Sequence, residues 1–433
     1  GDRFPDSEAR CAFAIGDYMV LAGTQGQRHH RKLDRILHVA GDWNIPLVLF
    51  AEGGGGRPGD TERFTYAGIS TKTFSQFASL SGKVPMVGIV SGRCFAGNAA
   101  LLGCCDVIIA DESANIGMAG PAMIEGGGLG IYPPEAIGPI DEQCANGVVD
   151  IRVTDEAEAC AVARQYLSYF QGPVADWTAP DPRRLRHVVP ENRLRVYEVR
   201  DAIDGIADEG SVLELRREFG VGIVTAFIRI EGMPFGIIAN NPRHLGGAID
   251  GPASDKASRF MQLCDAFDIP LVSLCDTPGF MVGPEYERTG LVRHVCRMFV
   301  TARSLSVPMF SVVLRKCYGL GAQGMVSGGT YDNFFTVSWP TGEFGPMGLE
   351  GAVTLGFRRE LEAVTDPDEK KALYDKLVAE MYEQGKALKV AQTLEIDAVI
   401  DPVDTRNWIL AGLRSTKLRP PLSGQKRPMV DTW

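Results

Sequence analysis

The sequence lacks any apolar run long enough to cross a membrane. The best candidate, residues 84–110, is interrupted by Arg93 and Asp106. The first ten residues are charged where a secretory signal would be apolar, so we expect a cytoplasmic protein. A basic excess is also missing, because 44 Lys and Arg residues face 54 Asp and Glu residues, giving a net charge of −10. This balance disfavours a general nucleic-acid binder, and we expect neither nucleic acid nor membrane as a partner.

Two cofactor motifs are absent as well. None of the ten cysteines forms a Cys-x-x-Cys pair, so the sequence indicates neither a zinc ribbon nor a redox pair, and we expect no metal in this chain. Cysteines in apolar runs, such as Cys94, Cys104 and Cys275, are expected to be reduced core residues. No Gly-x-x-x-x-Gly-Lys-Ser/Thr phosphate loop occurs, so ATP chemistry is not expected here.

The most informative feature that is present is an internal repeat. Ile45-Pro46-Leu47-Val48 recurs 224 residues later as Ile269-Pro270-Leu271-Val272, and Lys32 and Arg35 meet Lys256 and Arg259 at the same offset. At an offset of 223, Val84-Pro85-Met86 recurs as Val307-Pro308-Met309, and Cys94 meets Cys317. Matches at nearly constant offset along some 65 residues predict a duplicated domain.

Each copy alternates short apolar runs with helix-like stretches. Strands are expected over 11–22 and 233–240, and helices over 27–41, 74–80, 155–170, 253–267, 289–304 and 367–394. This alternation predicts an α/β fold with parallel sheets. We expect domains at residues 1–172 and 193–433, joined by a Pro-rich polar linker at 173–192, and an extended tail after Lys417.

Glycine-rich turns end the apolar runs at matching places in both copies. We expect helices to begin at Gly97-Asn98, within residues 92–101, and at Leu320-Gly321, within residues 318–323. The free backbone N–H groups at such helix starts can bind an anion. Two such turns suit a reaction that develops two oxyanions, such as enolate formation beside a thioester. The alternative is that these glycines only permit tight turns. The run Gly53–Gly56 is harder to explain that way, because four glycines lose much entropy on folding, and it predicts close backbone approach to a ligand or a neighbouring chain.

These motifs resemble the carboxyltransferase subunits of biotin-dependent acyl-CoA carboxylases, the propionyl-, acetyl- and methylcrotonyl-CoA types. Residues 52–57 are similar to the family's Ser-Gly-Gly-Ala-Arg loop, and residues 92–98 to its Gly-Pro-Cys-Ala-Gly-Gly-Ala turn. Further similar segments, which together span nearly the whole chain, are 240–242, 264–271, 276–280, 315–321 and 345–353. The segments 22–35 and 50–60 are similar to single-chain acyl-CoA carboxylases, including long-chain types, so the chain is expected to be either a free subunit or a domain of a larger polypeptide.

The resemblance implies two crotonase-like β-β-α spiral domains, a hexamer, and transfer of a carboxyl group from carboxybiotin to an acyl-CoA. Biotin carboxylase and the biotin carrier would lie in other domains or chains, since no Met-Lys-Met biotinylation site is present. It implies catalytic amides at Gly97, Asn98, Leu320 and Gly321. The acyl-CoA would be bound by Gly54, Gly55, Gly56, Arg57, Ala119, Gly120, Arg28 and Lys32, and biotin by Thr277, Pro278, Gly279, Phe280 and Gln323.

Three residues depart from the family's pattern. Asn98 replaces the usual Ala and Leu320 a Gly, but both keep the backbone N–H. Gln323 replaces an Asp of the propionyl type, which leaves the choice of acyl-CoA open. Alternative functions are a biotin-dependent decarboxylase or transcarboxylase using the same site in reverse, a crotonase-type hydratase or isomerase, and a non-catalytic hexameric scaffold. His29 and His30 either contact coenzyme A phosphates or lie on a solvated helix face.

Overall fold

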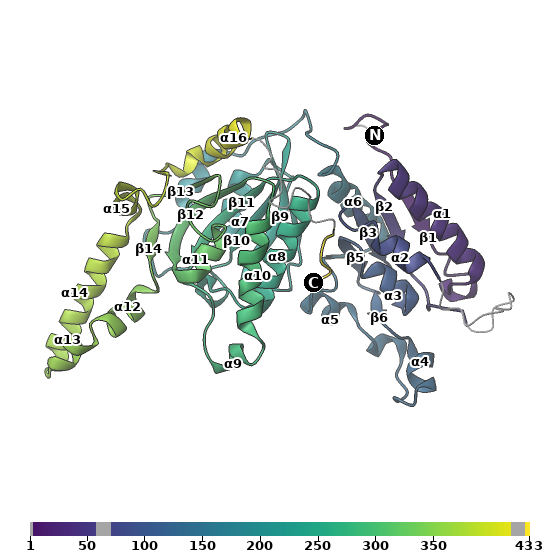
Figure 1. Cartoon of the computed structure of the whole chain (residues 1–433), viewed down its shortest axis with the longest axis horizontal. Coiled ribbons are helices and arrows are strands. Elements are labelled where there is room, and N and C mark those ends of the chain that lie inside the picture. The colour runs from purple at the N-terminus through teal and green to yellow at the C-terminus, as the bar shows by residue number, and fades with distance from the viewer. Residues whose placement is uncertain (1–2, 58–70, 417–428) are drawn as a thin grey trace. The chain divides into compact units, whose positions relative to one another are not determined.

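The computed structural model describes residues 3–57, 71–416 and 429–433, which form two compact units (Figure 1). Unit 1 comprises residues 1–175, 213–219 and 426–433, and unit 2 comprises 176–212 and 220–425. Within the described residues, no helix combines the length and the apolar character needed to cross a bilayer.

Unit 1 contains a parallel sheet with the strand order β1-β2-β3-β5-β7. Its strands are β1 (Ala12–Ile15), β2 (Leu47–Phe50), β3 (Met86–Val90), β5 (Val107–Asp111) and β7 (Ile151–Val153). A small parallel pair, β4 (Arg93–Phe95) and β6 (Asn115–Gly117), follows, and β8 (Leu213–Leu215) also belongs to this unit. The helices are α1 (Gln27–Trp43), α2 (Thr73–Ala78), α3 (Gly97–Leu102), α4 (Pro121–Gly126), α5 (Ile140–Ala145) and α6 (Glu156–Ser168).

Unit 2 contains a mixed sheet with the order β15-β13-β12-β11-β10-β9, in which only the β9–β10 pair is antiparallel. The strands are β9 (Ile223–Ile230), β10 (Met233–Asn240), β11 (Leu271–Thr277), β12 (Met309–Tyr318), β13 (Phe335–Ser338) and β15 (Ala398–Val399); β14 (Glu343–Gly345) pairs with β12. All eight residues of β9 are buried, as expected for a strand covered on both faces.

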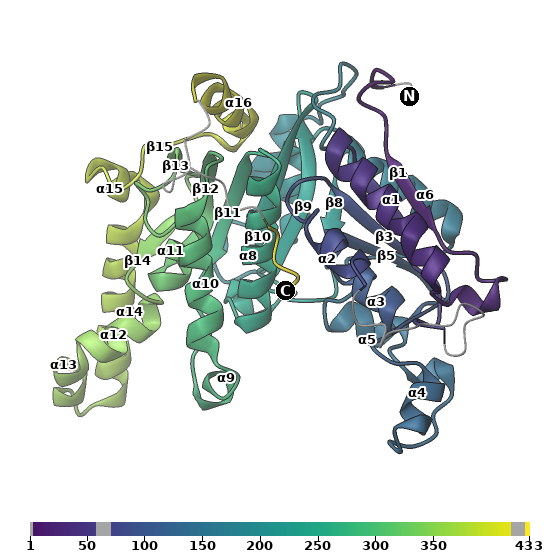
Figure 2. The ribbon, with the colours of Figure 1, turned by 45° about the vertical axis from the view of Figure 1, so that its right-hand side comes forward.

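Unit 2 also contains helices, several of which pack against this sheet. They are α7 (Val199–Ile206), α8 (Gly251–Ala266), α9 (Pro284–Glu287), α10 (Leu291–Ser304), α11 (Gly319–Met325), α12 (Leu349–Gly356), α13 (Arg358–Ala363), α14 (Pro367–Gly385), α15 (Ala387–Gln392) and α16 (Thr405–Ser415). Helices α8 and α10 lie side by side in both views of the molecule (Figure 2). Short 3-10 turns complete the units at Leu21–Gly23, Pro134–Ala136, Pro182–His187, Leu245–Gly247 and Pro402–Asp404.

The predicted α/β class with parallel strands is confirmed. Five of the six expected helices agree with the structure within a few residues, because their apolar faces recur at helical spacing; α1, for instance, buries Leu33, Leu37 and Ala40. The helix expected over 155–170 begins after Asp155, whose side chain accepts a hydrogen bond from the Glu158 amide.

Four expectations need comment. The strand expected over 11–22 is wrong beyond Ile15, where β1 ends, because Leu21 and Ala22 have positive φ angles within a 3-10 turn. The helix expected over 367–394 is wrong as a single element, because it divides into α14 and α15 at Lys386. Residues 182–189 of the predicted polar linker contribute Leu185 and Val189 to the hydrophobic core of unit 2. Residues 417–428 of the predicted extended tail lie outside the described part of the chain.

Candidate functional site

In unit 1, the predicted Gly97-Asn98 turn lies where β4 passes into α3. Ala96 precedes the helix with a φ of 52°, a region that L-residues seldom occupy, and its amide is held by the Gly117 carbonyl oxygen at 3.0 Å. Gly97 and Asn98 begin α3, so no earlier residue of the helix can accept a hydrogen bond from their amides. The first turn of a helix is where the sequence predicted these two residues.

The side chain of Asn98 connects this turn to the glycine loop. Asn98 is 5% exposed; its Oδ1 accepts a hydrogen bond from the Gly55 amide at 3.1 Å, and its Nδ2 donates one to the Glu52 carbonyl oxygen at 3.1 Å. The sequence indicated only the backbone N–H of this residue. Its amide side chain was missed, because the pairing depends on a loop that is 43 residues away in the chain.

The close approach predicted for residues 53–56 occurs within unit 1 itself. A Cβ atom on Gly53 would lie 2.3 Å from the Gly23 carbonyl oxygen, and one on Gly55 would lie 2.5 Å from the Ala96 Cβ. Both residues also have positive φ angles, of 152° and 85°. A side chain at Gly53 would therefore push the glycine loop away from Gly23, and one at Gly55 would push it away from Ala96.

The other residues predicted to bind acyl-CoA lie around this turn to differing degrees. Lys32 lines a cavity of about 330 Å³, together with Gln25, His29 and Asn98 and with apolar side chains of β1, α1 and β2. Arg28 is exposed on α1. Arg57 donates to the Thr24 carbonyl oxygen at 2.9 Å, so part of its guanidinium group braces the loop.

Ala119 and Gly120 precede α4 and are half-buried. A Cβ atom on Gly120 would lie 3.1 Å from the ring of Phe95, which directly precedes the Ala96–Gly97 turn. The structure therefore brings this pair to the same part of unit 1 as the first predicted amide site.

Two histidines on α1 are held in a partly buried environment. His30 Nδ1 lies 3.0 Å from the Thr73 hydroxyl, which itself donates to Asp34. Because Thr73 gives its only proton to Asp34, it can accept the proton on Nδ1 of neutral His30. Burial lowers the pKa of both His29 and His30, so both rings favour the neutral form near pH 7.

In unit 2, the predicted turn occurs where β12 passes into α11. Gly319 has a φ of 58°, and Leu320 and Gly321 follow it in the first turn of α11, where no earlier residue of the helix can accept a hydrogen bond from their amides. The Leu320 side chain is 63% exposed, so it does not cover this turn in the isolated chain.

The residues predicted to bind biotin adjoin this second turn. A Cβ atom on Gly321 would lie 2.5 Å from the carbonyl carbon of Gly279 and 2.7 Å from the Phe280 nitrogen. The Gly279 amide donates to the Thr277 hydroxyl at 3.1 Å, which shapes the turn at Pro278. Gln323 is exposed on α11, two residues beyond Gly321.

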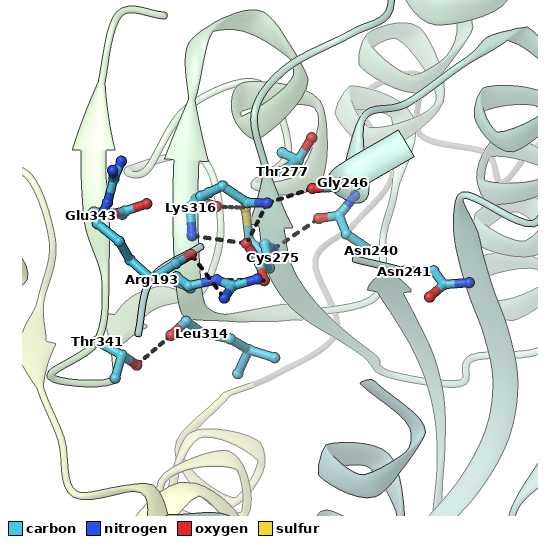
Figure 3. Close-up of polar contacts among 12 residues, drawn as sticks. Arg193, Asn240, Asn241, Gly246, Cys275, Thr277, Leu314, Lys316, Thr341 and Glu343 are labelled. Carbon is cyan, nitrogen blue, oxygen red and sulfur yellow. Dashed lines mark hydrogen bonds and ion pairs between the residues drawn. The ribbon is translucent and has the colours of Figure 1, made fainter. Parts of the chain in front are cut away.

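A buried ionic cluster beneath the second turn was not predicted. Asp276 is fully buried with Arg315 at 3.0 Å, and Glu343 is paired with Arg193 at 3.0 Å (Figure 3). The motifs at 276–280 and 315–321 were noted in the sequence, but their pairing depends on the register of two parallel strands.

Comparison with known proteins identifies the family of this chain. The profile of the carboxyl transferase domain family matches residues 9–423. The chain belongs to the carboxyl transferase family. It is 32% identical over 414 residues to the methylmalonyl-CoA carboxyltransferase 12S subunit of Propionibacterium freudenreichii subsp. shermanii, covering 92% of this chain and 77% of the relative. The carboxyltransferase relatives of this chain are enzymes, and this chain is an enzyme as well.

Two solved structures of carboxyl transferases are similar over most of the chain. A single-chain, multi-domain long-chain acyl-CoA carboxylase matches with a TM-score of 0.90 and 58% identity over 95% of this chain, which spans 40% of the length of that protein. The transcarboxylase 12S subunit, described as a hexamer with methylmalonyl-CoA bound, matches with a TM-score of 0.82 and 31% identity over 94% of this chain and 80% of its own. The predicted family is thus confirmed.

Proposed function

We propose that this carboxyl transferase moves a carboxyl group from carboxybiotin to the α-carbon of an acyl-CoA thioester. The observation that carries the proposal is the pair of strand–turn–helix sites, one in each unit, that place Gly97-Asn98 and Leu320-Gly321 in the first turn of a helix. Carboxybiotin on a separate domain would supply the CO2 and accept the α-proton, and the enolate carbon of the acyl-CoA would then form its new bond to that CO2.

The two turns divide the developing charge between them. In the proposal, Gly97 and Asn98 donate their amides to the thioester oxygen as it becomes an enolate oxygen. Leu320 and Gly321 donate theirs to the ureido oxygen of biotin. Backbone amides suit this role because they are rigid and do not titrate, and one such donor contributes roughly 2.7–4 kcal/mol in a transition state.

The remaining predicted residues would then hold the two substrates. Lys32 and Arg28 would meet the coenzyme A phosphates, with the loop Gly54–Arg57 and the pair Ala119-Gly120 beside the thioester. The segment Thr277–Phe280 and Gln323 would contact biotin. The support is that Lys32 shares a cavity with Asn98, that Gly55 and Gly120 lie beside the first turn, and that Gly279 lies beside the second. Arg57, which bonds to Thr24, acts mainly through the loop it braces.

We infer that both units are crotonase-like domains derived by duplication. Backbone hydrogen bonds recur at an offset of 224 residues: Gln25 N to Gly55 O in unit 1, and Ile249 N to Gly279 O in unit 2. Asn44 and Asp268, at the same offset, both have positive φ angles, of 53° and 59°. Rare conformations at matching positions support a common origin.

The preferred substrate in this proposal is a long-chain acyl-CoA. Support comes from the 58% identity to the long-chain acyl-CoA carboxylase, against 32% to the methylmalonyl-CoA enzyme. We expect the purified chain, given free biotin, to decarboxylate α-carboxylated acyl-CoAs, with kcat/KM rising from malonyl-CoA to long-chain analogues. Chromatography of the acyl-CoA product across a panel of chain lengths measures this. No product at any chain length would refute the function, and a maximum at the short end would refute only the chain-length proposal.

A transcarboxylase or decarboxylase remains the second candidate. Relatives with those names are 32% and 30% identical to this chain, similar to the carboxylase subunits. The chemistry at the two turns is the same in either direction, so the partner proteins determine whether the enzyme carboxylates or decarboxylates its acyl-CoA. We propose a cytoplasmic hexamer that works with biotin carboxylase and a biotin carrier, in the same polypeptide or in separate chains. Light scattering checks the assembly, and an active monomer would contradict it.

A further inference from the structure

Strands β11 and β12 lose their regular pairing just before the second turn. Cys275 pairs with Val313, but Thr277 pairs with Cys317, so the segment 314–316 of β12 lies opposite Asp276 alone. Such a bulge re-aims the strand that carries it. The redirected residues lead to Tyr318 and α11, and therefore to the amides of Leu320 and Gly321.

The carboxylate of Asp276 fills the bulge. Its Oδ1 accepts the Lys316 amide at 3.0 Å and lies 3.6 Å from Lys316 Nζ. Its Oδ2 accepts Arg315 Nε at 3.2 Å and lies 3.0 Å from Arg315 Nη2. Asp276 is 0% exposed and Arg315 3% exposed, so water cannot substitute for these bonds.

The same three residues are tied to other segments of unit 2. The Arg315 guanidinium donates to the carbonyl oxygens of Arg193 at 3.2 Å and Arg195 at 2.7 Å. Lys316 Nζ donates to the Gly246 carbonyl oxygen (Figure 3). Burial lowers the pKa of the Lys316 ammonium group. The bulge is thus fixed on both sides by charged hydrogen bonds.

Asp276 is also the residue that precedes the proposed biotin segment. Its own amide donates to Asn240 Oδ1 at 3.0 Å, which fixes the end of β11. Thr277 follows directly, and its hydroxyl organises Gly279. Gly279 in turn packs against Gly321 at backbone contact distance. The Asp276 carboxylate therefore lies at the base of two neighbouring segments of unit 2, residues 277–280 and residues 319–321.

We propose that Asp276 is a positioning residue that holds the segment 277–280 and the amides at 320–321 in register for the biotin half of the reaction. This rests on the proposed function of those turns. Asp276 acts through the backbone and does not touch the substrate. A displacement of about 1 Å at a reacting group can lower the rate about 100-fold, so small relaxation of the bulge is sufficient.

The test replaces Asp276 by asparagine in the full chain and separates the two substrates. We expect Asp276→Asn to lower kcat/KM for free biotin about 100-fold, with a raised KM for biotin, while the KM for the carboxylated acyl-CoA stays within about twofold. Lys316→Met, which keeps the backbone bond to Asp276 and removes only the Nζ contacts, should change the biotin kinetics in the same direction by a smaller factor.

Asp208→Asn is the matched control. Asp208 is equally buried in unit 2 and paired with Arg406 at 2.7 Å, and its carboxylate accepts the Glu231 and Gly232 amides. This variant should lower the melting temperature but leave both KM values unchanged. If Asp276→Asn and Lys316→Met alter the biotin kinetics no more than Asp208→Asn does, the positioning role is refuted. An inactive wild-type chain would instead refute the proposed function.

Discussion

Replacing Gly321 by alanine is expected to lower carboxyl transfer at least about 100-fold, as loss of one oxyanion donor does elsewhere. The added methyl group would lie 2.5 Å from the Gly279 carbonyl carbon and 2.7 Å from the Phe280 nitrogen. Backbone atoms cannot rotate away as a flexible side chain can, so the turns at 277–280 and 319–321 must separate. The initial rate of acyl-CoA formation with free biotin measures the loss.

Gly351→Ala provides the control for this substitution. Gly351 lies in α12, and a Cβ atom there meets nothing within 4 Å. The same change should leave activity intact and stabilise the helix by up to about 1 kcal/mol, because alanine favours helix over glycine. Gly321→Ala with wild-type kinetics in a folded protein would remove Leu320 and Gly321 from the mechanism.

Replacing Asn98 by alanine is expected to affect the acyl-CoA half of the reaction. The Gly55 amide and the Glu52 carbonyl oxygen would each lose a buried partner at 3.1 Å. An unsatisfied buried group costs about 1–3 kcal/mol, so unit 1 should be less stable and the glycine loop should separate from the amides of α3. We expect a roughly tenfold rise in the KM for acyl-CoA, equivalent to about 1.4 kcal/mol, with little change in the KM for biotin.

Asn146→Ala is the comparison for Asn98→Ala. Asn146 is exposed in unit 1 but makes two similar bonds, donating to Gln143 Oε1 at 3.0 Å and accepting from the Val148 amide at 3.1 Å. Water replaces its bonds, so both stability and kinetics should change little. Equal effects of the two substitutions on the KM for acyl-CoA would show that the Asn98 bridge does not organise the site.

The helix expected over 367–394 shows a limit of prediction from local sequence patterns. Its periodicity continues through Lys386, yet α14 ends at Gly385. A Cβ atom on Gly385 would lie 2.3 Å from the Phe344 carbonyl oxygen, so this glycine packs against β14. The position of that break is set by tertiary packing, which a local pattern does not contain.

The side chains that support the two turns were likewise not predicted from the sequence. The turns themselves were predicted, because glycines before helix-forming residues have a local meaning. Asn98 and Asp276 were not recognised as supports, since their partners lie on other loops and strands. Their role depends on the strand register, and a shift of one residue would direct each side chain to the opposite face.

By itself, the sequence determined the α/β class, five of the six helices expected from it and the two glycine turns, because periodicity, capping and glycine's conformational freedom are local properties. The tertiary structure alone decided which buried polar groups meet: Asn98 with the glycine loop, and Asp276 with Arg315 and Lys316. Those contacts join segments about 40 residues apart, and only the packed sheets bring their atoms within hydrogen-bonding distance.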